Sequence, residues 1–152
     1  MEVDGSPVEL DVDWLSEDLL FVLREHCGVR GPKEGCDDGQ CGSCTVLVDG
    51  TSRYACLVLT GTVLGRAVTT VAGLGEPGGE SALQRAFVDA GAVQCGFCTP
   101  GLIVAAEDLM RRHPNPSALT DDEIREALVG NLCRCTGYGR IIAAVRAAAQ
   151  ER

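Results

Sequence analysis

The chain has 152 residues, of which 45% are hydrophobic and 4% aromatic, and a formal net charge of −9 at pH 7. This length accommodates one domain or two small ones, with an aromatic-poor core that needs reinforcement by bound metal or cross-links. So acidic a chain does not attract nucleic acid or anionic lipid. No apolar stretch approaches membrane-spanning length. We therefore expect neither a nucleic acid nor a membrane as a partner.

The first residues, from Met1 to Gly5, are acidic and turn-forming, and they lack the basic start and apolar run of a secretory signal. We therefore expect a cytoplasmic protein. In that reducing compartment the nine cysteines of the chain are more often metal ligands than disulfide partners, and their odd number also opposes complete pairing.

The chain begins with a predicted hairpin. Residues 8–12 alternate apolar and acidic side chains, which is typical of a half-buried strand. Asp4 and Gly5 can turn the chain so that this strand pairs with residues 1–3.

A helix is expected next. Ser16 is its predicted N-cap, and Gly28 is placed to end it. The apolar side of this helix consists of Leu19, Leu20 and Leu23.

The following segment predicts a loop and then three strands. Residues 31–44 show no periodicity, whereas Thr45–Val48 and residues 54–59 have the composition of strands joined through a turn at Asp49, and residues 68–71 form one more. Strands and a helix in this order favour a small ferredoxin-like β-grasp domain.

From residue 74 to residue 80 the chain is rich in Gly and Pro, and beyond it the apolar period changes to that of helices. Four helices are expected, in two hairpins. Their signals are apolar positions from Leu83 to Ala90, Thr99 as an N-cap followed by Pro100 at the first helical position, the Thr120 capping box, and apolar positions from Ile141 to Ala149. The predicted fold class is therefore α+β, with one domain at residues 1–73 and an all-α domain at residues 74–152.

Eight cysteines form two groups of four. The first group reads C-x4-C-x2-C-x11-C, the spacing of a plant-type 2Fe–2S site. Three glycines beside its cysteines permit positive φ and let backbone N–H groups approach an anionic core. Zinc is a weaker alternative, because zinc sites favour paired C-x2-4-C hooks. The predicted ligands are Cys36, Cys41, Cys44 and Cys56.

The second group reads C-x2-C-x34-C-x-C and lies in the two loops that join the helices of each expected hairpin. If these loops meet, four thiols converge at one end of the helices, and two helix N-termini point at a core of charge about −2. The predicted ligands of this second 2Fe–2S site are Cys95, Cys98, Cys133 and Cys135.

Three alternatives compete for the second group: a thioredoxin-type redox pair of Cys95 and Cys98, a zinc site, and inert buried thiols. The redox pair leaves Cys133 and Cys135 unexplained, and C-x-C is a poor hook for zinc. The ninth cysteine, Cys27, ends an apolar-faced helix and is interpreted as a structural thiol without a ligand role.

Three long strings carry a family resemblance: GPKEGCDDGQCGSCTVLVDG, AVQCGFCTPG and ALVGNLCRCTGYGRI. Together they resemble the small iron–sulfur subunit, or the equivalent domain, of the molybdenum hydroxylase family, which includes xanthine dehydrogenase, aldehyde oxidoreductase and carbon monoxide dehydrogenase. The resemblance covers the chain from about Val8 to about Arg146.

The resemblance implies an electron-transfer subunit that makes and breaks no substrate bond itself. Electrons would pass from a molybdenum-pterin centre on a large subunit through the two 2Fe–2S clusters to FAD on a medium subunit, in a heterotrimer that can dimerise. It also implies that Gln94 and Cys135 contact the pterin. A free-standing ferredoxin-type carrier and a zinc-stapled interaction module are the alternative functions.

Overall fold

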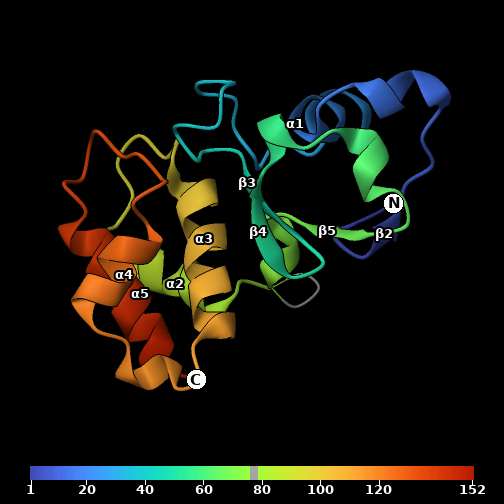
Figure 1. Ribbon diagram of the computed structural model, residues 1–152. Coiled ribbons are helices and arrows are strands. Elements are labelled where there is room, and N and C mark those ends of the chain that lie inside the picture. Colours follow the sequence, from blue (N-terminus) through green and yellow to red (C-terminus); the bar gives the residue numbers. More distant parts are fainter. Residues whose placement is uncertain (76–78) are drawn as a thin grey trace.

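The computed structural model describes residues 1–75 and 79–152 and places a small mixed sheet beside a group of helices (Figure 1). The central part of the predicted Gly/Pro-rich boundary, residues 76–78, lies outside the described residues. None of the described helices is both long and apolar enough to cross a membrane.

Five short strands of the described chain form one sheet in the order β2-β1-β5-β3-β4. The β1–β5 pair is parallel and the other pairs are antiparallel. The strands are β1 (Glu2–Val3), β2 (Ser6–Pro7), β3 (Thr45–Val48), β4 (Thr51–Tyr54) and β5 (Ala67–Thr69).

Helix α1 (Leu19–Phe21) continues into a π-helical turn (Val22–His26) and covers the sheet side of the molecule. Four further helices occupy the other side in Figure 1. They are α2 (Ala82–Asp89), α3 (Thr99–Arg112), α4 (Asp121–Ala127) and α5 (Gly139–Gln150). Helix α5 packs chiefly on α2 and also on α4, while α3 lies against strand β3.

Buried apolar side chains form two separate clusters, one for each side of the molecule. The first joins the sheet to α1 and includes Val46, Val68 and Leu23. The second lies among the helices and includes Phe87 and Ile141. The thin sheet and the helices therefore each have their own core, and α3 joins the two.

Most of the locally encoded predictions are confirmed. The Asp4-Gly5 turn produces the β1–β2 hairpin. Gly28 and Gly91 have positive φ values of 68° and 59° directly after their helices. Thr120 forms the predicted capping box, in which its hydroxyl accepts from the N–H of Glu123 and the Glu123 carboxylate accepts from the N–H of Thr120.

Two predicted strands are wrong. Residues 8–12 leave the sheet after Val8, which pairs with Met1, because strand β1 offers them no further partner. Residues 54–59 also do not form a strand: β4 ends at Tyr54, and a 3-10 turn (Ala55–Leu57) follows. Cys56 lies in that turn and packs against the core of the sheet side.

Three predicted boundaries also need correction. Asp18 and not Ser16 caps α1, because its carboxylate accepts a hydrogen bond of 2.8 Å from the N–H of Phe21. Thr99 is the first residue of α3 and Cys98 its N-cap. The strand expected at residues 68–71 is Ala67–Thr69.

Candidate metal centres

The three loops that carry seven of the eight predicted ligand cysteines lie at one end of the molecule, at the top of Figure 1, and Cys56 lies in the turn after β4. The three loops are residues 33–44 before β3, residues 91–98 before α3 and residues 128–138 before α5. The loops lead into β3, α3 and α5, whose N-terminal ends lie in the same region, so cysteines that are far apart in sequence lie near one another.

Two members of the first predicted set, Cys44 and Cys56, meet between loop 33–44 and the turn after β4. Cys44 Sγ lies 3.5 Å from Cys56 Sγ. Cys36 Sγ accepts backbone N–H groups from Gln40 and Cys41, each at 3.3 Å. These N–H groups stabilise negative charge on sulfur, as an iron–sulfur site requires.

The thiols of this set influence one another's pKa. Burial, followed by hydrogen bonding to Cys44 and the charge of that thiol, raises the pKa of Cys56 to about 12. Burial also raises the pKa of Cys41, but hydrogen bonds from Ser43 and Cys36 outweigh it and hold this pKa below its usual value. A thiol such as Cys56 stays protonated at neutral pH until a cation beside it compensates the charge.

The second predicted set joins two loops that are 40 residues apart. Cys135 Sγ lies 3.5 Å from Cys95 Sγ, and Cys133 Sγ lies 3.2 Å from Thr136 Oγ1. Cys98 is half-buried at the N-terminus of α3, whereas Cys95 and Cys135 are exposed. One edge of this set therefore faces solvent.

The pKa pattern of the second set resembles that of the first. Burial, then hydrogen bonding to Cys133, raises the pKa of Cys98 to about 12. Burial raises the pKa of Cys133 as well, but hydrogen bonds from Thr136 and the backbone of Cys135 lower it overall. Each set thus combines one thiol whose pKa is lowered with one whose pKa is raised and whose ionised form needs a neighbouring cation.

A cavity of about 280 Å³ lies between the two sets. It is lined by Cys41 of the first set together with all four cysteines of the second. Phe97 and Leu132, which are 46% and 54% exposed, also line it. The two candidate sites are therefore neighbours.

Gln94 is exposed and lines a pocket of about 220 Å³ that also contains Cys135, Thr136 and Arg140. The two residues that the family resemblance assigns to a pterin contact thus border the same small hollow. Cys27, by contrast, is half-buried against the core of the sheet, and burial raises its pKa.

The residues fit 2Fe–2S cores by the chemistry of their donors, which are all thiols, and by the N–H groups directed at Cys36. Within residues 1–75 and 79–152, no three or more His, Cys, Asp or Glu side chains converge as they would around a single metal ion; the close sulfur contacts are pairs, Cys44 with Cys56 and Cys95 with Cys135.

The sequence reasoning missed three residues that shape these loops. Tyr138 Oη accepts from the N–H of Cys133 at 2.7 Å and donates to the carbonyl of Asn131 at 3.0 Å. Thr136 contacts the Cys133 thiol. The only signal in the sequence was their position within a few residues of Cys133 and Cys135.

Two family matches cover these two halves of the chain. Residues 1–68 match a family described as a 2Fe-2S iron-sulfur cluster binding domain, and residues 70–146 match one described as a 2Fe-2S binding domain. The fold and the two thiol sets thus define a protein with two iron–sulfur binding domains.

Two curated relatives are named as iron–sulfur subunits of dehydrogenases. The nicotinate dehydrogenase small FeS subunit of Eubacterium barkeri is 48% identical over 133 residues, which is 88% of this chain and 83% of that subunit. The xanthine dehydrogenase iron-sulfur-binding subunit of Escherichia coli O157:H7 is 48% identical over 124 residues, which is 82% of this chain and 77% of that subunit.

Solved structures agree. Quinoline 2-oxidoreductase from Pseudomonas putida 86 matches with a TM-score of 0.85 and 40% identity, covering 98% of this chain and 91% of that one. Aldehyde oxidoreductase from Desulfovibrio gigas matches with a TM-score of 0.89 and 39% identity, covering 97% of this chain but 16% of that larger one. The chain belongs to the family of iron–sulfur small subunits of xanthine dehydrogenase-type and aldehyde oxidoreductase-type enzymes.

Proposed function

We propose that the chain is the electron-transfer iron–sulfur subunit of a molybdenum hydroxylase. The convergence of Cys95 and Cys135 from loops 40 residues apart carries this proposal, because Cys98 and Cys133 line the same cavity and four thiols are the ligand set of a 2Fe–2S core. The proposed ligands are Cys36, Cys41, Cys44 and Cys56 for one site and Cys95, Cys98, Cys133 and Cys135 for the other.

A 2Fe–2S core supplies one-electron redox chemistry when it is bound. The chain's own residues supply four thiolates for each site, N–H groups that stabilise their charge, and a packed support that fixes the loops. No side chain of the described residues is assigned a role in substrate chemistry.

The exposed edge of the second site supports a docking role. Gln94 and Cys135 share a small pocket at the surface, and we propose that this pocket receives the pterin of a molybdenum cofactor held by a large subunit. The proposal is in keeping with relatives that are named as small subunits.

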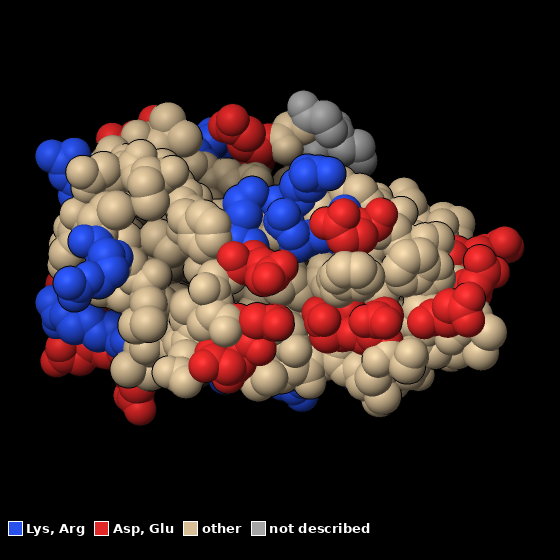
Figure 2. All heavy atoms as spheres, turned by 90° about the horizontal axis from the view of Figure 1, so that it is seen from above, with Lys and Arg blue, Asp and Glu red and all other residues tan. Residues whose placement is uncertain are grey.

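The first site is proposed to face FAD on a medium subunit. Its loop reaches the surface at Asp37, Asp38 and Gln40, and Leu57, which is 63% exposed, covers Gly39. On the face of Figure 2, acidic side chains gather mainly over the sheet side and basic ones near the centre and the helical end. The whole assembly would be a heterotrimer that can dimerise.

The division into residues 1–73 and 74–152 is also a proposal. It is supported by the two separate cores. Val71 and Leu74 of the 3-10 turn Val71–Leu74 both pack on the helical core, so the change from one core to the other begins a few residues before residue 74. The arrangement of α2 to α5 as two hairpins, and a cytoplasmic location that keeps thiols reduced, belong to the same proposal.

Anaerobic purification of the chain with its natural partners tests this function. The expected result is co-elution with larger flavin- and molybdenum-containing chains, iron and acid-labile sulfide for two clusters, and two distinct EPR signals on full reduction. A colourless protein without iron would favour the zinc-stapled module. Elution of an iron-loaded chain alone would favour the free ferredoxin-type carrier.

A further inference from the structure

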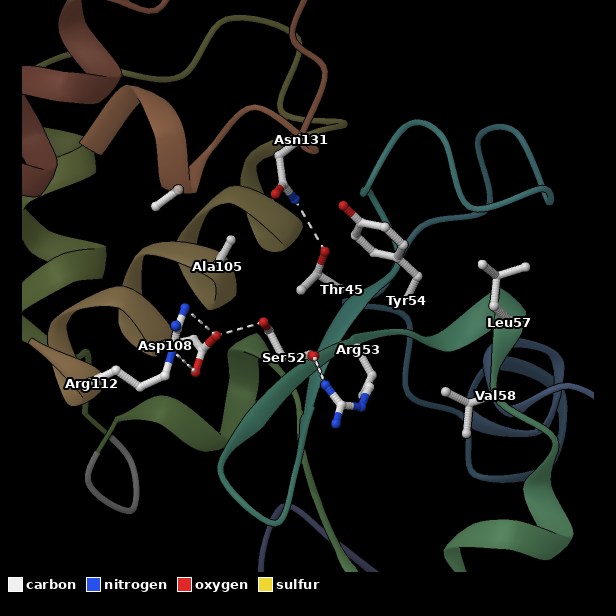
Figure 3. Close-up of a pocket in the computed structure, with 11 residues that line it drawn as sticks. Thr45, Ser52, Arg53, Tyr54, Leu57, Val58, Ala105, Asp108, Arg112 and Asn131 are labelled. Carbon is white, nitrogen blue, oxygen red and sulfur yellow. Dashed lines mark hydrogen bonds and ion pairs between the residues drawn. The ribbon is translucent and has the colours of Figure 1, made fainter. Parts of the chain in front are cut away.

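Asn131 joins the two cysteine-bearing loops through a buried side chain. It is 4% exposed, and its Nδ2 donates to the carbonyl of Gly42 at 2.9 Å and to Thr45 Oγ1 at 3.1 Å. Gly42 lies between Cys41 and Cys44. Figure 3 shows the bond between Asn131 and Thr45, which reaches from the loop after α4 to the start of β3.

The neighbouring backbone makes a direct link between the two sites. The N–H of Leu132 donates to the carbonyl of Cys41 at 2.9 Å. Leu132 is followed by Cys133, so one hydrogen bond and a short run of covalent bonds connect a thiol of the first site with a thiol of the second. The link lies beside the Asn131 side chain.

Further hydrogen bonds on both loops support the position of Asn131. On its own loop, its carbonyl accepts from Tyr138 Oη at 3.0 Å, and the same hydroxyl accepts from the N–H of Cys133. On the opposite loop, Thr45 Oγ1 donates to the carbonyl of Gly42 at 2.6 Å. A buried network of paired donors and acceptors of this kind favours a single arrangement of the two loops.

We propose that Asn131 is a positioning residue for electron transfer between the two sites, because it holds the Cys41 carbonyl against the N–H of Leu132. This inference rests on the proposed function. In the transfer, one electron leaves the site of Cys133, which is oxidised, and enters the site of Cys41, which is reduced. No bond forms or breaks, and no proton is required.

The alternative is that Asn131 only stabilises the contact between the two halves of the chain. Ser52 provides the matched control for this alternative. Its hydroxyl donates to Asp108 at 2.6 Å and so also joins the sheet to α3, but it lies away from the cysteine loops, as Figure 3 shows.

The test compares Asn131→Ala with Ser52→Ala in the iron-loaded protein isolated with its partners. Pulse radiolysis measures redistribution of an electron between the two sites, and amide hydrogen exchange by mass spectrometry measures protection of the peptide containing Leu132. Asn131→Ala is expected to slow the redistribution about tenfold, because a small displacement of the Leu132 N–H from the Cys41 carbonyl weakens the connection between the two sites. It is also expected to increase exchange at Leu132, whereas Ser52→Ala should change neither.

A second variant keeps the proposal testable if Asn131→Ala does not load its iron. Thr45→Val keeps the side-chain shape and removes the hydroxyl that accepts from Asn131, so a smaller change in the same direction is expected. Unchanged redistribution and exchange in an iron-loaded variant, or equal effects of Ser52→Ala, would overturn the role of Asn131. Absence of two EPR signals in the unaltered protein would instead contradict the proposed function.

Discussion

Asp4 and Thr70 are joined by two hydrogen bonds of 2.7 Å, although 66 residues separate them. The Asp4 carboxylate accepts from the backbone N–H of Thr70 with one oxygen and from the Thr70 hydroxyl with the other. Thr70 is fully buried and follows β5. The pair therefore ties the first hairpin to the segment that leads into the helices.

Asp4→Asn tests this tie. Asp4 has a φ of 48°, a left-handed conformation that Asn also adopts readily, so the backbone should be retained. The amide has one acceptor oxygen, and the second Thr70 donor loses its partner, at a cost of about 1–2 kcal/mol. Denaturant titration measures the loss, with Asp13→Asn at an exposed position as the control for the charge change. Equal midpoints for the two variants would contradict the role of Asp4.

Glu107 is 4% exposed on α3, and two arginines pair with it. Arg152 lies at 2.6 Å and Arg111 at 2.8 Å. Burial raises the pKa of Glu107, but the hydrogen bonds and charges of these arginines outweigh it and hold the pKa below its usual value.

This lowered pKa predicts a pH-dependent stability. Because the folded-state pKa lies below the unfolded one, the stabilisation is present above the unfolded pKa and is lost as pH falls through the folded pKa. Glu107→Gln should therefore lower the free energy of unfolding by about 1–2 kcal/mol at neutral pH and by less in acid. Denaturation at several pH values measures the difference, with the exposed Glu126→Gln as control. If the difference in the free energy of unfolding did not change with pH, the charge of Glu107 would not be the source of the stabilisation.

Cys27 and Cys98 are both half-buried, and burial raises the pKa of each, yet different roles are expected. Cys27→Ala should keep the iron of both sites, because this thiol packs on the sheet core. Cys98→Ser should lose the iron and the EPR signal of the second site while the first remains. Iron analysis and EPR spectra decide between these outcomes, and loss of iron in Cys27→Ala would show that a ligand had been missed.

Sequence patterns correctly predicted turns and helix caps, which are formed by residues close together in the chain. The Thr120 capping box spans three residues, and the Asp4-Gly5 turn closes its hairpin within a few more, so both could be read directly. The strand predicted at residues 8–12 failed because a strand needs a partner, and the alternation of side chains does not reveal whether one exists.

The same distinction applies to the cysteine sites. Spacing alone suggested which cysteines act together, but it did not reveal how the loops are supported. The bond from Asn131 to Gly42 spans 89 residues, and no local pattern marks either residue as its partner. Tyr138 was equally hidden, because its hydroxyl acts through the backbone of Asn131 and Cys133.

Gly42 lies at a close approach between the two halves of the chain. It has a φ of 68°, and a side-chain carbon at this position would collide with the carbonyl of Gly130 and lie 2.7 Å from Asn131 Nδ2. Gly101 of α3 faces the same loop, where an added carbon would collide with the Gly42 carbonyl. Bare backbone at these positions allows the loops to approach.

Gly42→Ala is therefore expected to separate the two cysteine loops, and Gly50→Ala provides the matched control. Gly50 has a comparable φ of 78°, but nothing lies within 4 Å of the added carbon. Gly50→Ala should show only the left-handed strain of about 1–2 kcal/mol, whereas Gly42→Ala adds the collision and should lose more stability. Denaturant titration and iron analysis measure both effects. If the two variants lost equal stability and kept equal iron, close contact at Gly42 would not be what holds the loops together.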